Sequence, residues 1–190
     1  MTSRLVIMGP QGSGKGTQAE RLAQHFSIPA ISTGDIFRTH IAGGTELGQL
    51  AQQYTARGEL VPDEVTDAMV RDRLGQADAA GGFILDGYPR NAAQVDALDT
   101  ILADHGVELD AVVQLTAERD ELMARMRRRA EIEGRADDTE EVIARRLDIY
   151  EAETAPLAAA YAARGLLVSV DGIGDIDAVT ERILTALQAD

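Results

Sequence analysis

Of the 18 lysines and arginines in this 190-residue chain, only one is a lysine, and it lies inside a glycine-rich stretch. It is Lys15, and residues 9–17 around it read GPQGSGKGT. The backbone N–H groups of such a loop, with the first turn of the helix that follows, bind phosphate oxygens. An ammonium is a compact point charge, whereas a guanidinium is a wide planar fork. The pattern therefore predicts a phosphate-binding loop in which Lys15 contacts the phosphate chain.

A second chemical group is Asp86, the first residue of the sequence DGYPR at 86–90. An apolar run precedes it, so we expect a buried strand that ends on this acid, where ligands bind in open α/β sheets. The residue after Lys15 is Gly16, where the usual loop has Ser or Thr, and Thr17 follows one position later. We therefore expect Mg²⁺ to be held by Asp86, through water, with Thr17 as a further candidate.

Arginines form the third group. In phosphoryl transfer, negative charge spreads over the oxygens of the moving group, and fixed guanidiniums stabilise it. The remaining arginines are expected on solvated helix faces. Five are candidates for the reaction: Arg38, Arg90, Arg129, Arg135 and Arg146.

Alternating strands and helices must position these groups. Apolar runs predict strands at 4–8, 29–31, 82–86, 111–115 and 166–170. Helical periodicity predicts helices at 14–25, from a cap at 32 or 33 to 41, and at 46–56, 63–74, 91–105, 118–129, 139–163 with a kink at Pro156, and 176–188. This order predicts an α/β P-loop NTPase fold, a five-stranded parallel sheet flanked by helices.

Two stretches interrupt the alternation. Residues 32–61 hold two predicted helices and no strand, and residues 128–138 form a polar connector. We expect both to be mobile insertions on a core formed by 1–31, 62–127 and 139–190.

Composition excludes several classes of function. A net charge of −14 argues against nucleic-acid binding and against an anionic membrane surface. The chain has no cysteine, which excludes disulfides and thiolate metal sites. No apolar stretch reaches the length of a membrane span, and the first residues lack a signal-peptide pattern, so a cytoplasmic location is expected.

From end to end, the chain resembles the adenylate kinase family in its short-lid form. The matching stretches are GPQGSGKGTQ at 9–18, STGD at 32–35 with Arg38, GELVPD at 58–63, FILDGYPR at 83–90 with Gln94, GRADD at 134–138 and RLDIY at 146–150. The resemblance implies reversible transfer of the terminal phosphoryl group of ATP to AMP, giving two ADP. It also implies an NMP-binding subdomain at 32–61 and a short lid at 128–138.

The resemblance assigns two groups of site residues. Those implied to bind ATP are Gly12, Ser13, Gly14, Lys15, Gly16, Thr17, Arg129 and Gly174. Those implied to bind AMP are Thr33, Gly34, Arg38, Glu59, Leu60, Val61, Gly87, Tyr88, Pro89, Arg90, Gln94, Arg135 and Arg146. Catalysis is implied for Lys15, Arg90, Arg129, Arg135 and Arg146, and Gln94 would read the adenine edge.

The expected cofactor is Mg²⁺ bound with ATP, and no zinc is expected. We also expect the protein to be a monomer. Two other functions stay open at this point. The acceptor could be UMP or CMP, although Thr33 and Gln94 favour adenine. The chain could also be a nucleotide-binding regulatory module with little turnover, although it lacks a guanine-reading Asn-Lys-x-Asp motif.

Overall fold

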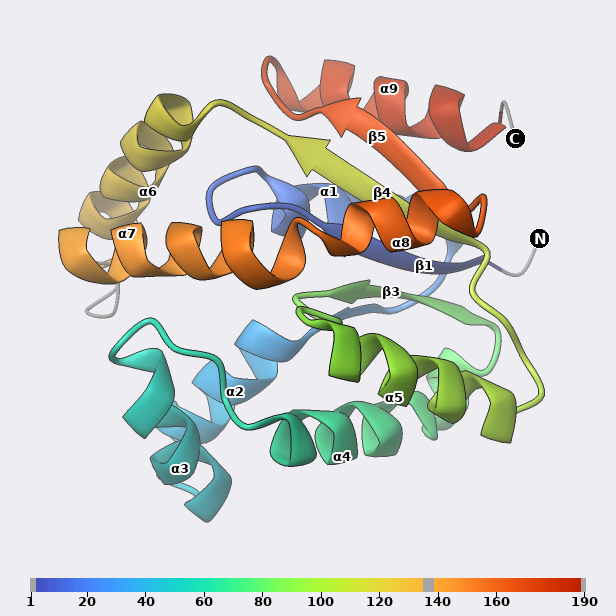
Figure 1. Cartoon of the computed structure of the whole chain (residues 1–190), viewed down its shortest axis with the longest axis horizontal. Coiled ribbons are helices and arrows are strands. Elements are labelled where there is room, and N and C mark those ends of the chain that lie inside the picture. Colours follow the sequence, from blue (N-terminus) through green and yellow to red (C-terminus); the bar gives the residue numbers. More distant parts are fainter. Residues whose placement is uncertain (1–2, 135–138, 189–190) are drawn as a thin grey trace.

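The computed structural model describes residues 3–134 and 139–188, and a sheet of five parallel strands lies at its centre (Figure 1). The strands are β1 (Ser3–Met8), β2 (Ala30–Ser32), β3 (Gly82–Asp86), β4 (Ala111–Thr116) and β5 (Leu167–Asp171). Their order across the sheet is β2-β3-β1-β4-β5. The predicted α/β fold with a five-stranded parallel sheet is confirmed.

Helices connect the strands as predicted, most within two residues of the expected bounds. They are α1 (Lys15–Phe26), α2 (Thr33–Ala42), α3 (Glu46–Thr55), α4 (Asp63–Leu74), α5 (Ala92–Asp104), α6 (Arg119–Glu133), α7 (Glu140–Ile149), α8 (Leu157–Ala163) and α9 (Ile176–Gln188). Ser32 is the residue that caps α2, since its hydroxyl accepts a hydrogen bond from the Asp35 N–H.

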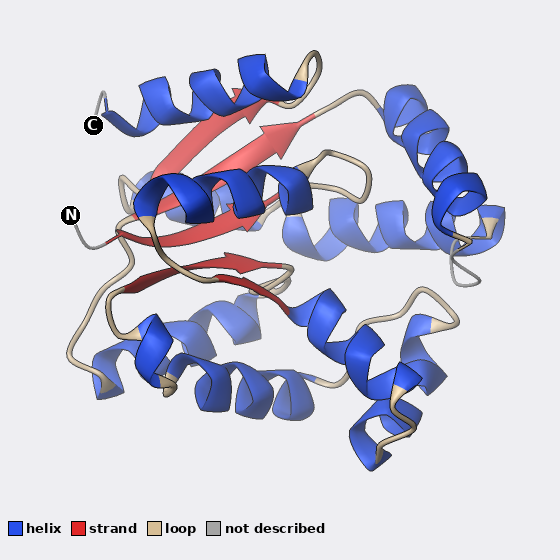
Figure 2. Cartoon of the chain, turned by 180° about the vertical axis from the view of Figure 1, so that it is seen from behind, coloured by secondary structure: helices blue, strands red, loops and turns tan. Residues whose placement is uncertain are grey.

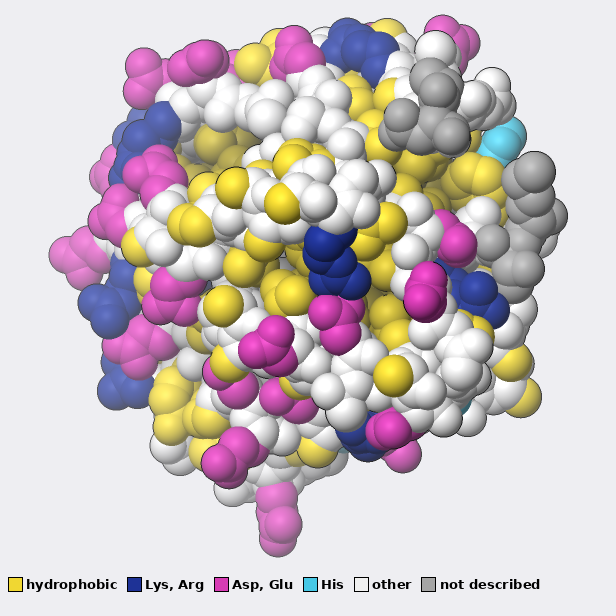
Figure 3. All heavy atoms as spheres, turned by 45° about the vertical axis from the view of Figure 1, so that its right-hand side comes forward, with side chains coloured by type: hydrophobic (Ala, Val, Ile, Leu, Met, Phe, Trp, Pro, Cys, Tyr) yellow, Lys and Arg dark blue, Asp and Glu magenta, His cyan; other side chains and the backbone are white. Residues whose placement is uncertain are grey.

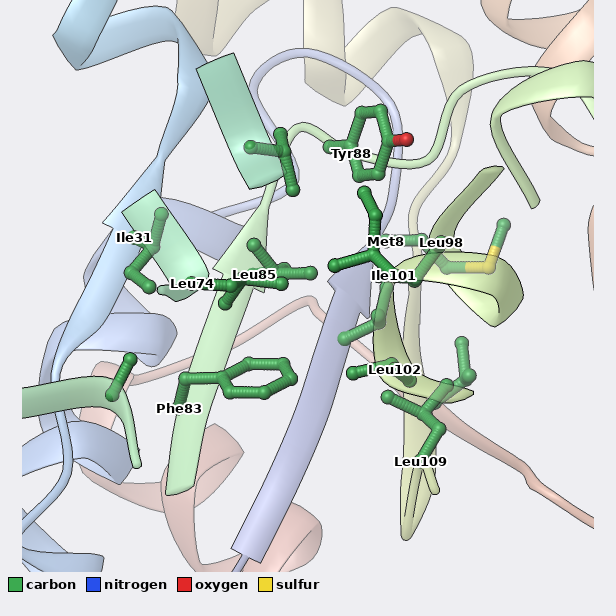
Figure 4. Packing of buried hydrophobic residues seen from close by; sticks show 14 of the residues in the cluster. Met8, Ile31, Leu74, Phe83, Leu85, Tyr88, Leu98, Ile101, Leu102 and Leu109 are labelled. Carbon is green, nitrogen blue, oxygen red and sulfur yellow. The ribbon is translucent and has the colours of Figure 1, made fainter. Parts of the chain in front are cut away.

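Successive residues of a strand point to opposite faces of the sheet, so each apolar strand serves two cores. On one face, Val6 and Leu85 pack with α4, α5 and α8, and Figure 4 shows this cluster extending from Phe83 to Tyr88. On the other face, Ile7 and Ile84 pack against α1 and α9. Helices cover both faces of the sheet in Figure 2.

Two helix pairs have small cores of their own. The pair α2–α3 buries Phe37 and Ala51 together with Val61. The pair α6–α7, side by side in Figures 1 and 2, buries Met126 and Ile143. Each pair therefore has a small core of its own beside the sheet, and Ile36 of α2 also packs against the core that contains Val6 and Leu85.

Two predicted boundaries differ from the structure. The helix expected to end near Arg129 continues to Glu133, so the first half of the expected connector 128–138 is helical, and residues 135–138 lie outside the described part. The helix expected over 139–163 stops at Ile149, passes through a π-helical turn (Tyr150–Thr154) and resumes at Leu157. The interruption begins before Pro156, because the backbone changes to the wider hydrogen-bonding pattern of a π-helix already at Tyr150.

A short 3-10 turn (Ala77–Ala79) precedes β3 and was not predicted. Figure 3 shows acidic side chains scattered over the face in view, as the net charge of −14 leads one to expect. Among the described helices, none combines the length and the apolarity that crossing a membrane requires.

Candidate active site

The loop between β1 and α1 has the backbone of a phosphate-binding loop. Gly12 and Gly14 have φ angles of 83° and 88°, a left-handed conformation that favours glycine. The Ser13 N–H donates to the Pro10 carbonyl at 3.1 Å, which closes the turn, and α1 begins at Lys15. The loop therefore ends at a helix N-terminus, where unpaired N–H groups attract anions.

A cleft of about 430 Å³ opens beside this loop at the carboxyl end of the sheet. Lys15 lines it together with α2, the segment before α4, the segment after β3, and α7. Of the residues assigned to AMP, twelve line it: Thr33, Gly34, Arg38, Glu59, Leu60, Val61, Gly87, Tyr88, Pro89, Arg90, Gln94 and Arg146. Arg135, the thirteenth, lies outside the described residues.

Most residues assigned to ATP lie outside this cleft. Gly12, Ser13 and Gly14 form the turn of the loop, and Gly16 and Thr17 are exposed in the first turn of α1. Gly174 lies in the loop between β5 and α9.

Lys15 sits among charges of both signs. Burial lowers the pKa of its ammonium to about 8, Asp86 opposes this shift, and Arg90, Arg129 and Arg38 reinforce it. Four charged side chains, from α2, α6, the end of β3 and the segment directly after it, therefore act on Lys15. A phosphate chain placed among these cations would add negative charge and so favour the charged form of Lys15, which burial and the three arginines disfavour.

Asp86 fits a role in metal binding. It ends β3, is only 9% exposed, and its Oδ1 atom is buried without a hydrogen-bond partner. A methyl group placed on Gly16 would lie 3.6 Å from the Oδ2 atom, so the carboxylate faces the first turn of α1. A buried, unpaired carboxylate oxygen beside a phosphate loop suits hydrated Mg²⁺. Within the described residues, no three His, Asp or Glu side chains cluster as a metal site.

The segment after β3 positions Arg90. Its Nε donates to the Gly87 carbonyl at 2.7 Å, and Thr33 donates its hydroxyl hydrogen to the same carbonyl at 3.1 Å. Burial lowers the pKa of Arg90, with Asp86 opposing. Gly87 has a φ of 84°, and a Cβ there would lie 2.7 Å from the Thr33 hydroxyl. Only glycine fits this close approach of α2 to the turn after β3.

Two further cleft arginines come from opposite sides. Arg38 forms an ion pair with Asp35 on α2. Arg146 of α7 donates to the Thr55 carbonyl at 3.4 Å, at the end of α3. Together with Arg90, they line the cleft from three elements that are far apart in the sequence.

Arg127, Arg128 and Arg129 follow one another, so the sequence does not settle which of them faces the ATP phosphates. Their environments in the structure differ. Arg127 is exposed and pairs with Glu140, and Arg128 is exposed as well. Arg129 is partly buried and is one of the charges that lower the pKa of Lys15. This supports Arg129 as the residue that faces the phosphate loop.

Sequence reasoning missed Arg125, one helical turn before Arg129 on the same face of α6. Its Nη1 lies 3.4 Å from the Gly12 carbonyl and 3.3 Å from the Gly172 carbonyl. Arg125 therefore joins the phosphate loop to the loop that carries Gly174. Spacing of four from Arg129 was the available signal, but it is common on solvated helices.

The parallel sheet, the loop after β1 and the arginine-lined cleft define a P-loop nucleoside monophosphate kinase. A family model described as adenylate kinase matches residues 7–166. The adenylate kinase of Bifidobacterium longum is 62% identical over 185 residues, 97% of this chain and 100% of that protein. That of Kocuria rhizophila is 58% identical over 186 residues, 98% of this chain and 99% of the relative. The chain belongs to the adenylate kinase family.

The reaction follows from this membership. The protein is an enzyme that transfers the terminal phosphoryl group of ATP to AMP, reversibly, and yields two ADP. Adenylate kinases use Mg²⁺ with ATP.

Proposed function

We propose that the phosphate loop is the donor site and the cleft the acceptor site of this reaction. Residues 12–17 wrap the phosphates of ATP, and Lys15 bridges the β- and γ-phosphates. Arg129 holds ATP from α6, and the backbone of Gly174 contacts its adenine. The observation that carries the proposal is that Lys15 of the phosphate loop lines one cleft with Arg38, Arg90 and Arg146, which come from three separate segments of the chain.

On the acceptor side, Arg38 and Arg90 bind the AMP phosphate, and Thr33, Gly34 and Gly87 shape the pocket around the nucleotide. The backbone of Glu59, Leu60 and Val61 lines the base, beside Tyr88 and Pro89. Gln94 reads the adenine edge, since an amide both donates and accepts in one plane. Arg146 and Arg135 reach the phosphates during transfer.

Catalysis in this arrangement is positioning with electrostatic stabilisation. The attacking oxygen of the AMP phosphate is ionised at neutral pH, so it needs no general base. The γ-phosphorus leaves the β-phosphate oxygen of ATP and bonds to that AMP oxygen. Arginines fixed around the cleft stabilise the charge that spreads over the moving group.

Asp86 would hold Mg²⁺ through water, and Thr17 is a further candidate. When bound, the metal neutralises charge on the β- and γ-phosphates. The Asp86 Oδ1 atom, which has no hydrogen-bond partner, supports this role. The Oδ2 atom of the same carboxylate faces Gly16 in the first turn of α1.

Closure completes the site. Residues 32–61 and 128–138 move over the core of 1–31, 62–127 and 139–190, and their closure excludes water, which would otherwise accept the phosphoryl group. We further propose a cytoplasmic monomer that needs no zinc and binds neither nucleic acid nor membranes.

A coupled assay with ATP and Mg²⁺ across AMP, UMP, CMP and GMP tests the acceptor. We expect AMP to be preferred by at least about a hundredfold in kcat/KM, as in sites that hydrogen-bond their substrate. A pyrimidine preference would show that the acceptor pocket has been misassigned. Nucleotide binding without transfer to any monophosphate would favour a regulatory role instead.

A further inference from the structure

The side-chain amide of Gln94 is held at both ends in the acceptor cleft. Its Oε1 accepts the backbone N–H of Arg90 at 2.8 Å, and its Nε2 donates to Oδ1 of Asp63 at 2.9 Å. Gln94 is 2% exposed, so water does not replace either partner.

Each partner can bind only one end of this amide. A backbone N–H only donates, and a carboxylate only accepts. If the amide turned over, its NH₂ group would face the Arg90 N–H and its carbonyl would face Asp63. Both contacts would be unfavourable in a buried site, where unmatched polar groups are costly. The orientation of the Gln94 amide therefore follows from the chemistry of its neighbours.

Asp63 is itself fixed by a third side chain. The Asn91 Nδ2 donates to the same Asp63 Oδ1 at 2.9 Å, and the Asn91 Oδ1 accepts the Gln94 backbone N–H at 2.9 Å as the cap of α5. Capping fixes the carbonyl end of Asn91, which leaves its NH₂ end for Asp63. Asp63, Asn91 and Gln94 thus form a network in which every amide has one allowed orientation.

After these bonds, the Gln94 amide keeps one N–H and one oxygen lone pair for a ligand, in a fixed order. Adenine presents a donor at position 6 and an acceptor at position 1. Hypoxanthine, the base of IMP, presents an acceptor at position 6 and a donor at position 1. An amide that cannot turn over matches only one of these two edges.

We propose that Asp63 is a specificity-determining residue, which rejects 6-oxopurine acceptors by fixing the orientation of the Gln94 amide. This rests on the proposed reading of the base by Gln94. Asp63 acts through Gln94 and does not itself contact the nucleotide, so it is a positioning residue. Because AMP is the acceptor, the locked order is the one that matches adenine.

The test is the ratio of kcat/KM for AMP to that for IMP, at saturating MgATP, in Asp63→Ala. In this variant the acceptor of the Gln94 Nε2 group is lost, so only the Arg90 N–H still opposes an amide that turns over to meet hypoxanthine. We expect the ratio to fall about tenfold or more. The ratio does not depend on the fraction of active protein, so partial misfolding does not affect it.

Glu64→Gln is the matched control. Glu64 is exposed in the same first turn of α4, and this variant loses the same charge at the same helix end. Its ratio should stay within about twofold of the wild type, because an exposed charge in the first turn has only a small effect. An equal fall in Glu64→Gln would overturn the proposal, since charge alone would then explain the change.

The Gln94→Ala variant tests the reading of the base by Gln94 separately from the orientation of its amide by Asp63. If Gln94→Ala lowers the ratio and Asp63→Ala does not, Gln94 reads the base but Asp63 does not orient it, and the proposal is overturned. If Gln94→Ala also leaves the ratio unchanged, the reading of the base by Gln94 is wrong and the inference about Asp63 falls with it.

Discussion

At the scale of single residues, Lys15 combines two demands. Burial favours its neutral form and lowers its pKa to about 8, whereas phosphate binding needs the charged form. Asp86 shifts the balance towards the charged form, and Arg90, Arg129 and Arg38 shift it back. In the proposed donor site, bound ATP adds negative charge and raises the pKa of Lys15 again. Ligand and ammonium therefore stabilise each other.

The Lys15→Arg variant tests the size argument. We expect kcat to fall about a hundredfold or more, because the wide guanidinium does not fit a loop wrapped around a phosphate chain. Single-turnover measurements with AMP and ATP would show whether the chemical step is lost. Activity within about threefold of the wild type would contradict the size argument.

The pH dependence of kcat/KM for ATP tests the charge of Lys15. Below pH 8 the ammonium is protonated in the free enzyme, and above it the charge is lost, so kcat/KM should decline as pH rises through about 8. The decline in kcat should come at higher pH, because ATP raises the pKa. A kcat/KM for ATP that stays level to pH 10 would show that Lys15 is not the titrating group.

The same shift acts on stability in the opposite direction. The folded-state pKa lies below the ordinary lysine value of 10.5, so the buried ammonium opposes folding at pH below 8. Between pH 8 and 10.5 the unfolded chain holds a proton that the folded chain has released. The contribution of Lys15 to stability therefore rises with pH while its contribution to ATP binding falls.

Local motifs made some site residues predictable and left others out of reach. Lys15 and Asp86 could be predicted because a strand, a glycine loop and a helix are neighbours in the sequence. Arg125 could not, because its bond to the Gly12 carbonyl spans 113 positions of the chain. The same holds for Asp63, which contacts Gln94 from 31 positions away.

At the scale of elements, the π turn between α7 and α8 places Thr154 against the acceptor site. Its hydroxyl donates to the Arg90 carbonyl at 2.6 Å, and the residue is 5% exposed and lines the cleft. Turns of this kind are frequent at functional sites because the extra residue redirects the side chains. Helical periodicity in the sequence did not reveal the turn, since both flanking helices continue its apolar pattern.

Thr154→Val removes this hydrogen bond and nearly keeps the side-chain volume. It removes the Thr154 donor from the part-buried Arg90 carbonyl, at a cost of about 1–3 kcal/mol. We expect the KM for AMP to rise about fivefold or more, with the KM for ATP nearly unchanged. Thr154→Ser should restore the KM for AMP, because the hydroxyl returns. If Ser and Val raised it equally, packing of the methyl group and not the hydrogen bond would be the cause.

At the scale of the whole molecule, the α2–α3 region is fastened to α7 across the mouth of the cleft. Arg145 of α7 pairs with Glu59 at 2.7 Å, and a methyl group on Gly58 would lie 3.0 Å from the Val142 carbonyl. Arg145 is 55% exposed, so the ion pair contributes about 0–1 kcal/mol. Contacts this weak suit the proposed opening and closing of residues 32–61 in each turnover.

Arg145→Gln should loosen this region without unfolding the core. We expect amide hydrogen exchange in α2 and α3 to quicken about two- to fivefold, from the loss of one exposed pair. Arg164→Gln is the control, because it breaks the pair between Arg164, the residue after α8, and Asp99 of α5, and neither residue lines the cleft. Faster exchange in α2 and α3 in the control as well would mean that the effect is general destabilisation.

The pairing of β1 with β3 fixes how far apart the phosphate loop and the Asp86–Arg90 segment lie. Ile7 lies opposite Asp86 in this parallel pair, so the chain enters the phosphate loop and the Asp86–Arg90 segment from adjacent positions on one edge. Backbone hydrogen bonds of the sheet thus set the separation between the phosphate loop and the segment that carries Arg90. In the proposed assignment these two segments hold the two substrates, so the spacing of the substrates is fixed before either one binds. Slower closure should then delay the reaction without misaligning it.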